Sequence, residues 1–163
     1  MGAYRRLLQR LGRTRWFAWF IRRVLTPIDR AFGRRLPTPT TFGTGLPVLH
    51  LVTTGRTSGR PRSSPLLYID DGDRLVVAAT NFGAQHHPGW SYNLDAEPRA
   101  TVEWRGGDSR AVVARRATGD EIAGYWPRFV DMWAGYGAYK ERAAHRTIRV
   151  YVLEPSEAPA APR

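Results

Sequence analysis

The sequence predicts a mainly β (α+β) domain of about six antiparallel strands, with a few flanking helices and a basic amphipathic N-terminal helix. From Val48 onward, short runs rich in β-branched residues alternate with turn dipeptides. Two of these dipeptides, Asp71-Gly72 and Gly106-Gly107, are typical of tight hairpins. Residues 1–36 differ, because their apolar side chains recur at helical spacing. Two hairpins in one small domain favour a barrel or a sandwich.

The composition is that of a single globular domain. A chain of 163 residues buries enough apolar surface for one sizeable core, and 42% of its residues are hydrophobic. The chain has no cysteine, which excludes disulfides, thiolate metal sites and cysteine nucleophiles. This composition is consistent with a reducing, cytoplasmic compartment.

The formal charge of +11 is unevenly distributed along the chain. Residues 1–35 contain ten arginines and one acidic residue, Asp29, whereas the other 128 residues contain 15 basic and 13 acidic side chains. The high isoelectric point therefore belongs to the N-terminal segment, and an electrostatic argument about a partner must begin there.

The N-terminal segment over residues 1–36 is predicted to be helical. Its apolar positions lie three or four residues apart, and arginines fill the other faces. The longest apolar run, residues 16–21, is far too short to span a bilayer, and no secretory signal is present. Two alternatives remain open for residues 4–25: peripheral contact with an anionic membrane on its cytoplasmic face, or packing on the chain's own domain.

The remaining elements follow from local patterns. We expect a Pro/Gly linker over 37–47, the main domain over 48–155 and a disordered tail over 156–163. Strands are expected over residues 48–53, 64–70, 74–80, 100–105, 109–117 and 147–153. Thr118 and Glu121 form a capping box that begins a helix over 119–131, and a second helix is expected over 136–143.

An arginine-rich loop is expected between the first two strands. Residues 53–62 read Thr-Thr-Gly-Arg-Thr-Ser-Gly-Arg-Pro-Arg. Glycines allow backbone N–H groups to face a ligand, and arginines bind phosphate or carboxylate through two hydrogen bonds. The segment is not a P-loop, because it lacks the Gly-Lys-Ser/Thr ending. It is either an anion site or a hairpin loop with solvated arginines.

Two further segments have a composition suited to ligand binding. Residues 78–93 leave a strand and enter a polar, aromatic loop, a usual location for ligand contacts. Its adjacent His86 and His87 lack further partners at ligand spacing, so we expect no metal site. Trp133, Tyr136 and Tyr139 lie three residues apart, as on one helix face, and form either core packing or the wall of a substrate cavity.

These segments together resemble the deazaflavin-dependent nitroreductase family, a branch of the split β-barrel flavin and deazaflavin oxidoreductases. The resemblance covers roughly residues 40–155, and it lies in the order and spacing of the motifs. The segments that carry it are Leu51–Arg62, Ser64-Pro65-Leu66, Ala79–Gly83, Pro88 through Trp90 to Asn93-Leu94, Tyr125-Trp126-Pro127 and Arg146-Thr147-Ile148.

The resemblance implies a split β-barrel that binds coenzyme F420, whose phosphate and oligoglutamate tail are anionic. It implies that the arginine loop holds the phosphate region and that the loop after the third strand lines the ring. The cofactor-binding residues implied are Arg56, Thr57, Ser58, Arg60, Pro61, Arg62, Pro65, Leu66, Thr80, Asn81, Phe82, Gly83, Trp90 and Asn93. The substrate side would be shaped by Trp133, Tyr136 and Tyr139.

The sequence departs from the family pattern at three positions. Thr57 stands where a lysine is often found, Asn81 replaces another lysine, and Trp133 replaces a tyrosine. Two fewer cations weaken the contact with the tail or change its path, and a missing tyrosine hydroxyl changes what the pocket can hydrogen-bond. The expected cofactor class is unaffected, whereas the substrate is left open.

The expected activity is hydride transfer from reduced F420 to a flat electrophilic acceptor such as a quinone, a nitroaromatic or an activated enone. As catalytic candidates, Thr80 and Tyr136 would donate a hydrogen bond to the charge developing on the acceptor. The alternatives are an FMN-binding oxidoreductase on the same fold and a non-catalytic carrier of a lipid or cofactor. Nucleic-acid binding is not expected, because no nucleic-acid fold signature is present.

Overall fold

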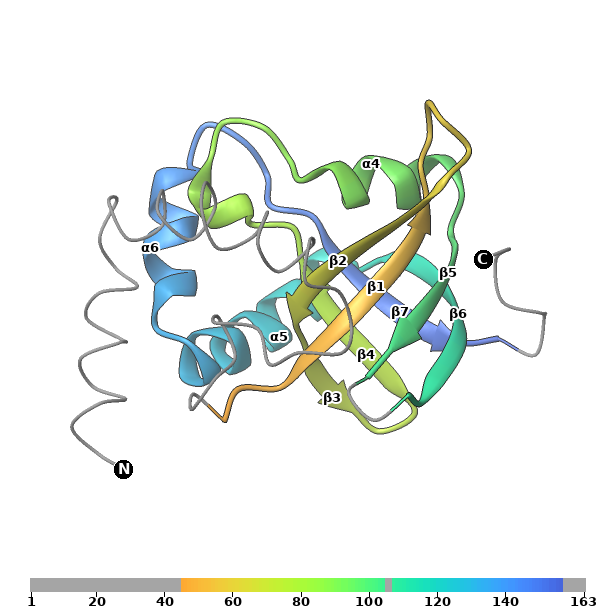
Figure 1. Cartoon of the computed structure of the whole chain (residues 1–163). Coiled ribbons are helices and arrows are strands. Elements are labelled where there is room, and N and C mark those ends of the chain that lie inside the picture. Colours follow the sequence, from red (N-terminus) through yellow and green to blue (C-terminus); the bar gives the residue numbers. More distant parts are fainter. Residues whose placement is uncertain (1–44, 105–106, 157–163) are drawn as a thin grey trace.

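The computed structural model describes residues 45–104 and 107–156, which form a curled antiparallel sheet with helices beside it and over one end (Figure 1). The sheet has seven strands in the order β2-β1-β5-β6-β7-β4-β3. The strands are β1 (Val48–Thr54), β2 (Pro61–Leu67), β3 (Ile69–Asp71), β4 (Arg74–Ala78), β5 (Arg99–Glu103), β6 (Ser109–Arg116) and β7 (Val150–Pro155).

Four helical elements accompany the sheet. They are the short 3₁₀ turn η3 (Asn81–Gly83), α4 (Gly89–Ala96), α5 (Gly119–Met132) and α6 (Gly135–Arg142). The capping box predicted at the start of α5 is present, because Thr118 Oγ1 accepts a hydrogen bond from Glu121 N and the Glu121 carboxylate accepts one from Thr118 N.

The sheet curls into a half-barrel through its two edge strands. β2 and β3 lie at opposite edges of the sheet, yet only Tyr68 separates them along the chain. The backbone N–H of Tyr68 donates to Pro47 O, outside the ladder of either strand. The predicted single strand over 64–70 is therefore wrong: the chain leaves the pairing with β1 at Leu67 and begins pairing with β4 at Ile69.

Side chains on the two faces of the strands build two apolar cores. The inner core fills the half-barrel, and alternate residues of the same strands point outward to α5 and α6. In β4, for example, Leu75 and Val77 face inward whereas Val76 and Ala78 face the helices. Helix α4 lies across one end of the sheet (Figure 1), and its residues Trp90 and Leu94 belong to the inner core. Both faces of the sheet are thus packed against apolar side chains.

The predicted turns agree with the structure, whereas several element ends are displaced. Gly72 has φ +77° in the β3–β4 hairpin, as the Asp71-Gly72 dipeptide predicts. The last strand begins at Val150 and not at residue 147. The predictions for residues 1–36, for most of the linker over 37–47 and for residues 157–163 lie outside the described part of the chain. No helix among the described residues is long and apolar enough to span a membrane.

Candidate cofactor and substrate site

The arginine loop (residues 55–62) closes on itself between β1 and β2. Gly55 N donates to Arg60 O at 2.9 Å, and Gly59 N donates to Gly55 O at 2.7 Å. A Cβ atom on Gly55 would lie 2.7 Å from Ser58 Oγ and 3.0 Å from Arg60 O, so a side chain there would displace Ser58 and press on the loop backbone. The tight turn leaves the side chains of Arg56, Thr57, Ser58 and Arg60 exposed to solvent.

Asn93 of α4 ties the arginine loop to the sheet. Its Oδ1 accepts a hydrogen bond from Arg56 N at 3.1 Å, and its Nδ2 donates to Thr53 Oγ1 at 2.9 Å. The Thr53 hydroxyl in turn donates to Arg62 O at 3.4 Å. Asn93 and Thr53 are both buried, so these bonds hold the base of the loop in a dry environment.

The arginines of the loop suit an anionic ligand. Arg56, Arg60 and Arg62 are exposed, and none of them pairs with a carboxylate of the described residues. Elsewhere in the described chain, ion pairs engage several other arginines, including Arg115 and Arg128. Three unpaired guanidinium groups on a closed loop therefore fit the phosphate-bearing cofactor that the sequence predicts.

The segment after β4 forms a second, unusually bent turn. Asn81, Phe82 and Gly83 have φ values of +47°, +56° and +78°, which only glycine adopts without cost. Asn81 Nδ2 donates to His86 O at 2.8 Å, and the Phe82 ring meets the Tyr139 ring edge to face at 5.7 Å. The Thr80–Gly83 turn is thereby fixed against α6.

Arg146 braces the Thr80–Gly83 turn from the other side. Its guanidinium donates to Thr80 O at 2.7 Å, to Ala84 O at 3.0 Å and to His87 Nδ1 at 3.0 Å. Because arginine can only donate, His87 accepts through Nδ1 and carries its proton on Nε2. Burial, followed by the charges of Arg149 and Arg146, lowers the pKa of His87 to about 4, so its ring is neutral at pH 7.

The three predicted substrate aromatics come together, although not on one helix face. Trp133 has extended backbone geometry at the end of α5, and its Nε1 donates to the Tyr139 hydroxyl at 3.2 Å. Tyr136 stacks on Phe129 with ring centroids 4.9 Å apart. Tyr136 and Tyr139 are both buried, and burial raises the pKa of each hydroxyl. Both hydroxyls therefore stay protonated at neutral pH.

Not all predicted site residues gather at these two turns. Trp90 points into the inner core, where its ring lies 5.5 Å from that of Tyr151, and Leu66 packs against the same core. Pro61 and Pro65 pair with Thr54 and His50 along β1. The structure thus joins Arg56 and Arg62 to Asn93, and it joins the Thr80–Gly83 turn to Tyr139, whereas Trp90 and Leu66 serve the barrel interior.

Several residues that contact the arginine loop and α4 are not predicted from the sequence. Thr53 is one of them: a hydroxyl at an inward position of β1, two residues after Leu51, signals a buried hydrogen bond just before the loop. Tyr92 and Arg149 are others. The guanidinium carbons of Arg56 and Arg149 lie 5.0 and 4.8 Å from the Tyr92 ring centroid. No local pattern reveals that contact, because its members come from three separate segments.

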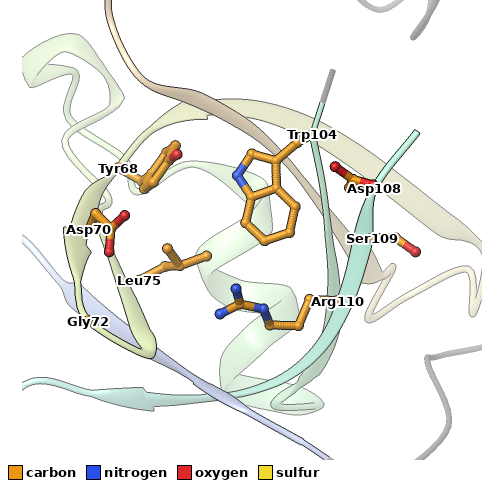
Figure 2. A pocket seen from close by; sticks show the side chains of 8 residues that line it. All are labelled: Tyr68, Asp70, Gly72, Leu75, Trp104, Asp108, Ser109 and Arg110. Carbon is orange, nitrogen blue, oxygen red and sulfur yellow. The ribbon is translucent and has the colours of Figure 1, made fainter. Parts of the chain in front are cut away.

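An open pocket lies away from these turns, at the opposite end of the strands. Figure 2 shows an open pocket of about 460 Å³ between the β3–β4 hairpin and the β5–β6 connection. Tyr68 and Trp104 form its aromatic sides, and Arg110 lies over the Trp104 ring at 5.2 Å. None of the predicted cofactor residues lines this pocket. Among the described residues no His, Cys, Asp or Glu cluster suits a metal ion.

Comparisons with known proteins identify the family. Residues 21–155 match the family model described as F420H(2)-dependent quinone reductase. A Mycobacterium tuberculosis protein of strain H37Rv, provisionally named as such a reductase, is 36% identical over 114 residues, which cover 70% of this chain and 94% of the relative. A second protein of that strain, named F420H(2)-dependent quinone reductase, is 34% identical over 115 residues, which cover 66% of this chain and 72% of the relative.

A solved structure of an F420-H2 dependent reductase is similar in fold. It has a TM-score of 0.60 and 28% sequence identity, and the match covers 66% of this chain and 94% of that chain. The split β-barrel architecture and the deazaflavin cofactor expected from the sequence are thereby confirmed. The chain belongs to the F420H(2)-dependent quinone reductase family, and coenzyme F420 is its cofactor.

Proposed function

We propose that this reductase transfers a hydride from reduced F420 to a flat electrophilic acceptor, with quinones as the first class to test and nitroaromatics and activated enones as further classes. The observation that supports the proposal is the position of two turns, the arginine loop and the Thr80–Gly83 turn, at the same end of the sheet. The arginine loop is tied to α4 through Asn93, and the Thr80–Gly83 turn is tied to α6 through Tyr139.

The residues assigned to the cofactor fall into two groups. Arg56, Ser58, Arg60 and Arg62 would hold the phosphate region, with Thr57 and Pro61 in the same loop. Thr80, Asn81, Phe82, Gly83 and Asn93 would serve the ring side. Pro65, Leu66 and Trp90 would act indirectly, because Pro65 and Leu66 lie farther along β2 and the Trp90 and Leu66 side chains pack in the inner core. The support for this division is the exposed, unpaired arginines of the first group and the left-handed turn at Asn81, Phe82 and Gly83 in the second. Reduced F420, when bound, supplies a hydride as a two-electron donor.

The chain's own contribution is to orient the acceptor and to stabilise the charge that develops on it. The hydroxyls of Thr80 and Tyr136 make no hydrogen bond with the described residues, so both remain available as donors. For a quinone, the acceptor gains the hydride and one proton from solvent and becomes a hydroquinone. The reaction would balance because reduced F420 loses a proton to solvent in addition to the hydride.

The substrate side is assigned to Trp133, Tyr136 and Tyr139. Their rings, together with Phe82 and Trp126, form a continuous aromatic cluster between α5, α6 and the Thr80–Gly83 turn. Aromatic surfaces favour flat, apolar ligands, which supports quinone-type acceptors.

The catalytic role of Tyr136 is testable by removing its hydroxyl. Tyr136→Phe should lower kcat with a quinone by about tenfold, because one transition-state hydrogen bond is lost, and should leave F420 affinity unchanged. Tyr125→Phe is the control, since the Tyr125 hydroxyl donates to Asp71, a residue remote from the two turns. An unchanged kcat for Tyr136→Phe would remove Tyr136 from the reaction, and Thr80→Val would then be examined in the same way.

We also propose that residues 4–25 place the enzyme on the inner face of the cell membrane, near lipid-soluble quinones. The support is the arrangement of arginines and large apolar residues at helical spacing in that segment. The full chain should sediment with anionic liposomes, and substitution of Trp16, Phe17 and Phe20 by serine should abolish this. Equal sedimentation of both proteins would reject the proposal.

A further inference from the structure

A concentration of positive charge lies on the face of α4, next to the arginine loop. The side chains of Arg56, Arg116, Arg146 and Arg149 surround Tyr92 and His87. Asp95 is the one carboxylate that forms ion pairs with this group in the described chain. The cluster therefore contains more positive than negative charge.

The two arginines at its centre are held by an aromatic ring. The guanidinium carbons of Arg56 and Arg149 lie 5.0 and 4.8 Å from the centroid of Tyr92, and His87 meets the same ring edge to face at 5.9 Å. Such contacts fix the two cations before any ligand arrives, which lowers the entropic cost of binding.

Asp95 does not neutralise both of these arginines. Arg116 engages its two oxygens, with Nε 3.1 Å from Oδ1 and Nη2 2.7 Å from Oδ2, and Tyr151 also donates to Oδ1. Arg149 Nη1 lies 2.9 Å from Oδ2, but the Arg149 guanidinium makes no hydrogen bond with the described residues. Arg56 has no carboxylate partner in the described chain. The charge of Arg56 is therefore unmatched, and that of Arg149 is only partly matched.

Arg146 and His87, two other members of the cluster, do not offer a free charge to a ligand. Arg146 donates to the carbonyl oxygens of Thr80 and Ala84, and its position is thus structural. Burial, followed by the charges of the surrounding arginines, lowers the pKa of His87. His87 is therefore neutral at pH 7 and does not change the net charge of the cluster.

We propose that Arg56 and Arg149, which both lie over the Tyr92 ring, form a binding site for an anion other than the cofactor's own phosphate, either a carboxylate or a free phosphate ion. Arg56 belongs to the arginine loop as well, so the site extends the loop's anion surface onto α4 and the residue before β7. Either the glutamate carboxylates of F420 or a free anion supplies the bound group. Only the first source rests on the proposed function.

The test measures affinities with the full-length protein and needs no turnover. Three probes are titrated by calorimetry: F420 with its glutamate tail, F420 lacking all glutamates but keeping its phosphate, and inorganic phosphate. The variants are Arg149→Gln and Asp95→Asn. The matched control is Arg110→Gln, which removes one positive charge at the opposite end of the strands, where Arg110 donates to Asp73 O. Thermal unfolding of each variant confirms that it is folded.

If the tail supplies the bound group, Arg149→Gln should weaken the binding of tailed F420 by about five- to tenfold and leave the tail-free form unaffected. Asp95→Asn should tighten the tailed form by about two- to fivefold, a gain that mere damage to the fold does not produce. If a free anion is the ligand, Arg149→Gln instead weakens inorganic phosphate binding and leaves both cofactor forms unchanged.

The inference is overturned if Arg149→Gln changes none of the three affinities, or if Arg110→Gln reduces them equally. An equal loss for tailed and tail-free F420 also overturns it, since Arg149 then acts on a part of the cofactor shared by both. If neither form of F420 binds the wild-type protein while phosphate binding depends on Arg149, the proposed function fails and this anion site stands.

Discussion

Asn93 joins three segments through one buried side-chain amide. It accepts from Arg56 N and donates to Thr53 Oγ1, so the shape of the arginine loop depends on a residue of α4. Thr53 and Asn93 are both buried, so removal of the amide leaves the Thr53 hydroxyl without this donor in a region closed to solvent.

Asn93→Ala should therefore lower the free energy of unfolding by about 1–3 kcal/mol and weaken F420 binding, because the loop loses its anchor. Urea unfolding and calorimetric titration measure the two effects. Ser91→Ala is the control within α4: its hydroxyl donates to Pro88 O, so it should reduce stability and leave F420 affinity intact. Equal loss of affinity in both variants would contradict the anchoring role.

His87 gives a prediction about pH. Its pKa falls from the ordinary 6.5 to about 4 in the folded protein, so the unfolded chain binds more protons between these values. Stability therefore decreases as the pH falls from about 6.5 to about 4, and this contribution is fully present above pH 6.5.

His87→Gln isolates that effect from the carboxylates that titrate nearby. The wild type should lose more unfolding free energy between pH 7 and pH 5 than the variant does, as measured by urea denaturation at both values. Parallel losses in the two proteins would show that His87 is not shifted in the folded state.

At the scale of single residues, the family resemblance predicts that Asn93 and the loop arginines belong to one site. The structure shows that Asn93 contacts the arginine loop through Arg56 N, and the role of these residues in binding stays a prediction. The resemblance does not predict Tyr92 and Arg149, because their contact with Arg56 depends on how β1, α4 and the start of β7 meet in space. A single sequence does not show that these three segments come into contact in the folded chain.

Among the elements, the Thr80–Gly83 turn and α6 form one unit. Gly83 has φ +78°, and a Cβ atom there would lie 2.7 Å from Arg142 Cβ and 3.1 Å from Tyr139 O. The turn therefore needs glycine both for its backbone geometry and for its close approach to α6.

Gly83→Ala should accordingly lower the unfolding free energy by about 1–3 kcal/mol and weaken F420 binding through displacement of the turn. The matched control is Gly137→Ala in α6, where nothing lies within 4 Å of the added Cβ. That substitution should be neutral or raise stability by about 0.5–1 kcal/mol, because alanine favours a helix. A stable Gly83→Ala protein would contradict the close packing of the turn on α6.

Local sequence patterns predict some features of the elements and not others. The Asp71-Gly72 hairpin dipeptide and the Thr118 capping box are local signals, and both appear in the structure as expected. The split at Tyr68 is not local, since it arises where the chain exchanges one partner strand for another across the half-barrel. Likewise, Trp133 ends α5 instead of lying on the same helix face as Tyr136 and Tyr139, and its Nε1 donates a hydrogen bond to the Tyr139 hydroxyl.

At the scale of the whole molecule, one rigid half-barrel supports two turns with different chemistry. The arginine loop presents cations, and the Thr80–Gly83 turn lies against an aromatic cluster. α4 connects them: Asn93 holds the loop, and Tyr92 contacts His87, which accepts from the Arg146 that braces the turn. A cofactor with an anionic end and a flat ring matches this division.

The fold class and the cofactor were predictable because both depend on strand patterning and on motif order along the chain. The acceptor is not encoded in the same way. Quinone-type chemistry is inferred from family membership and from the aromatic cluster. The arrangement of that cluster, including the buried Tyr136 and Tyr139, depends on how the helices pack and is not visible in the sequence.

The most direct test of this account is the affinity of the intact protein for F420 compared with FMN, measured by calorimetry on the same preparation. Both ligands carry a phosphate and a tricyclic ring, so the comparison reports the fit of the whole site and not of its arginines alone. We predict that F420 binds at least about tenfold more tightly than FMN. Equal affinity, or tighter binding of FMN, would contradict it.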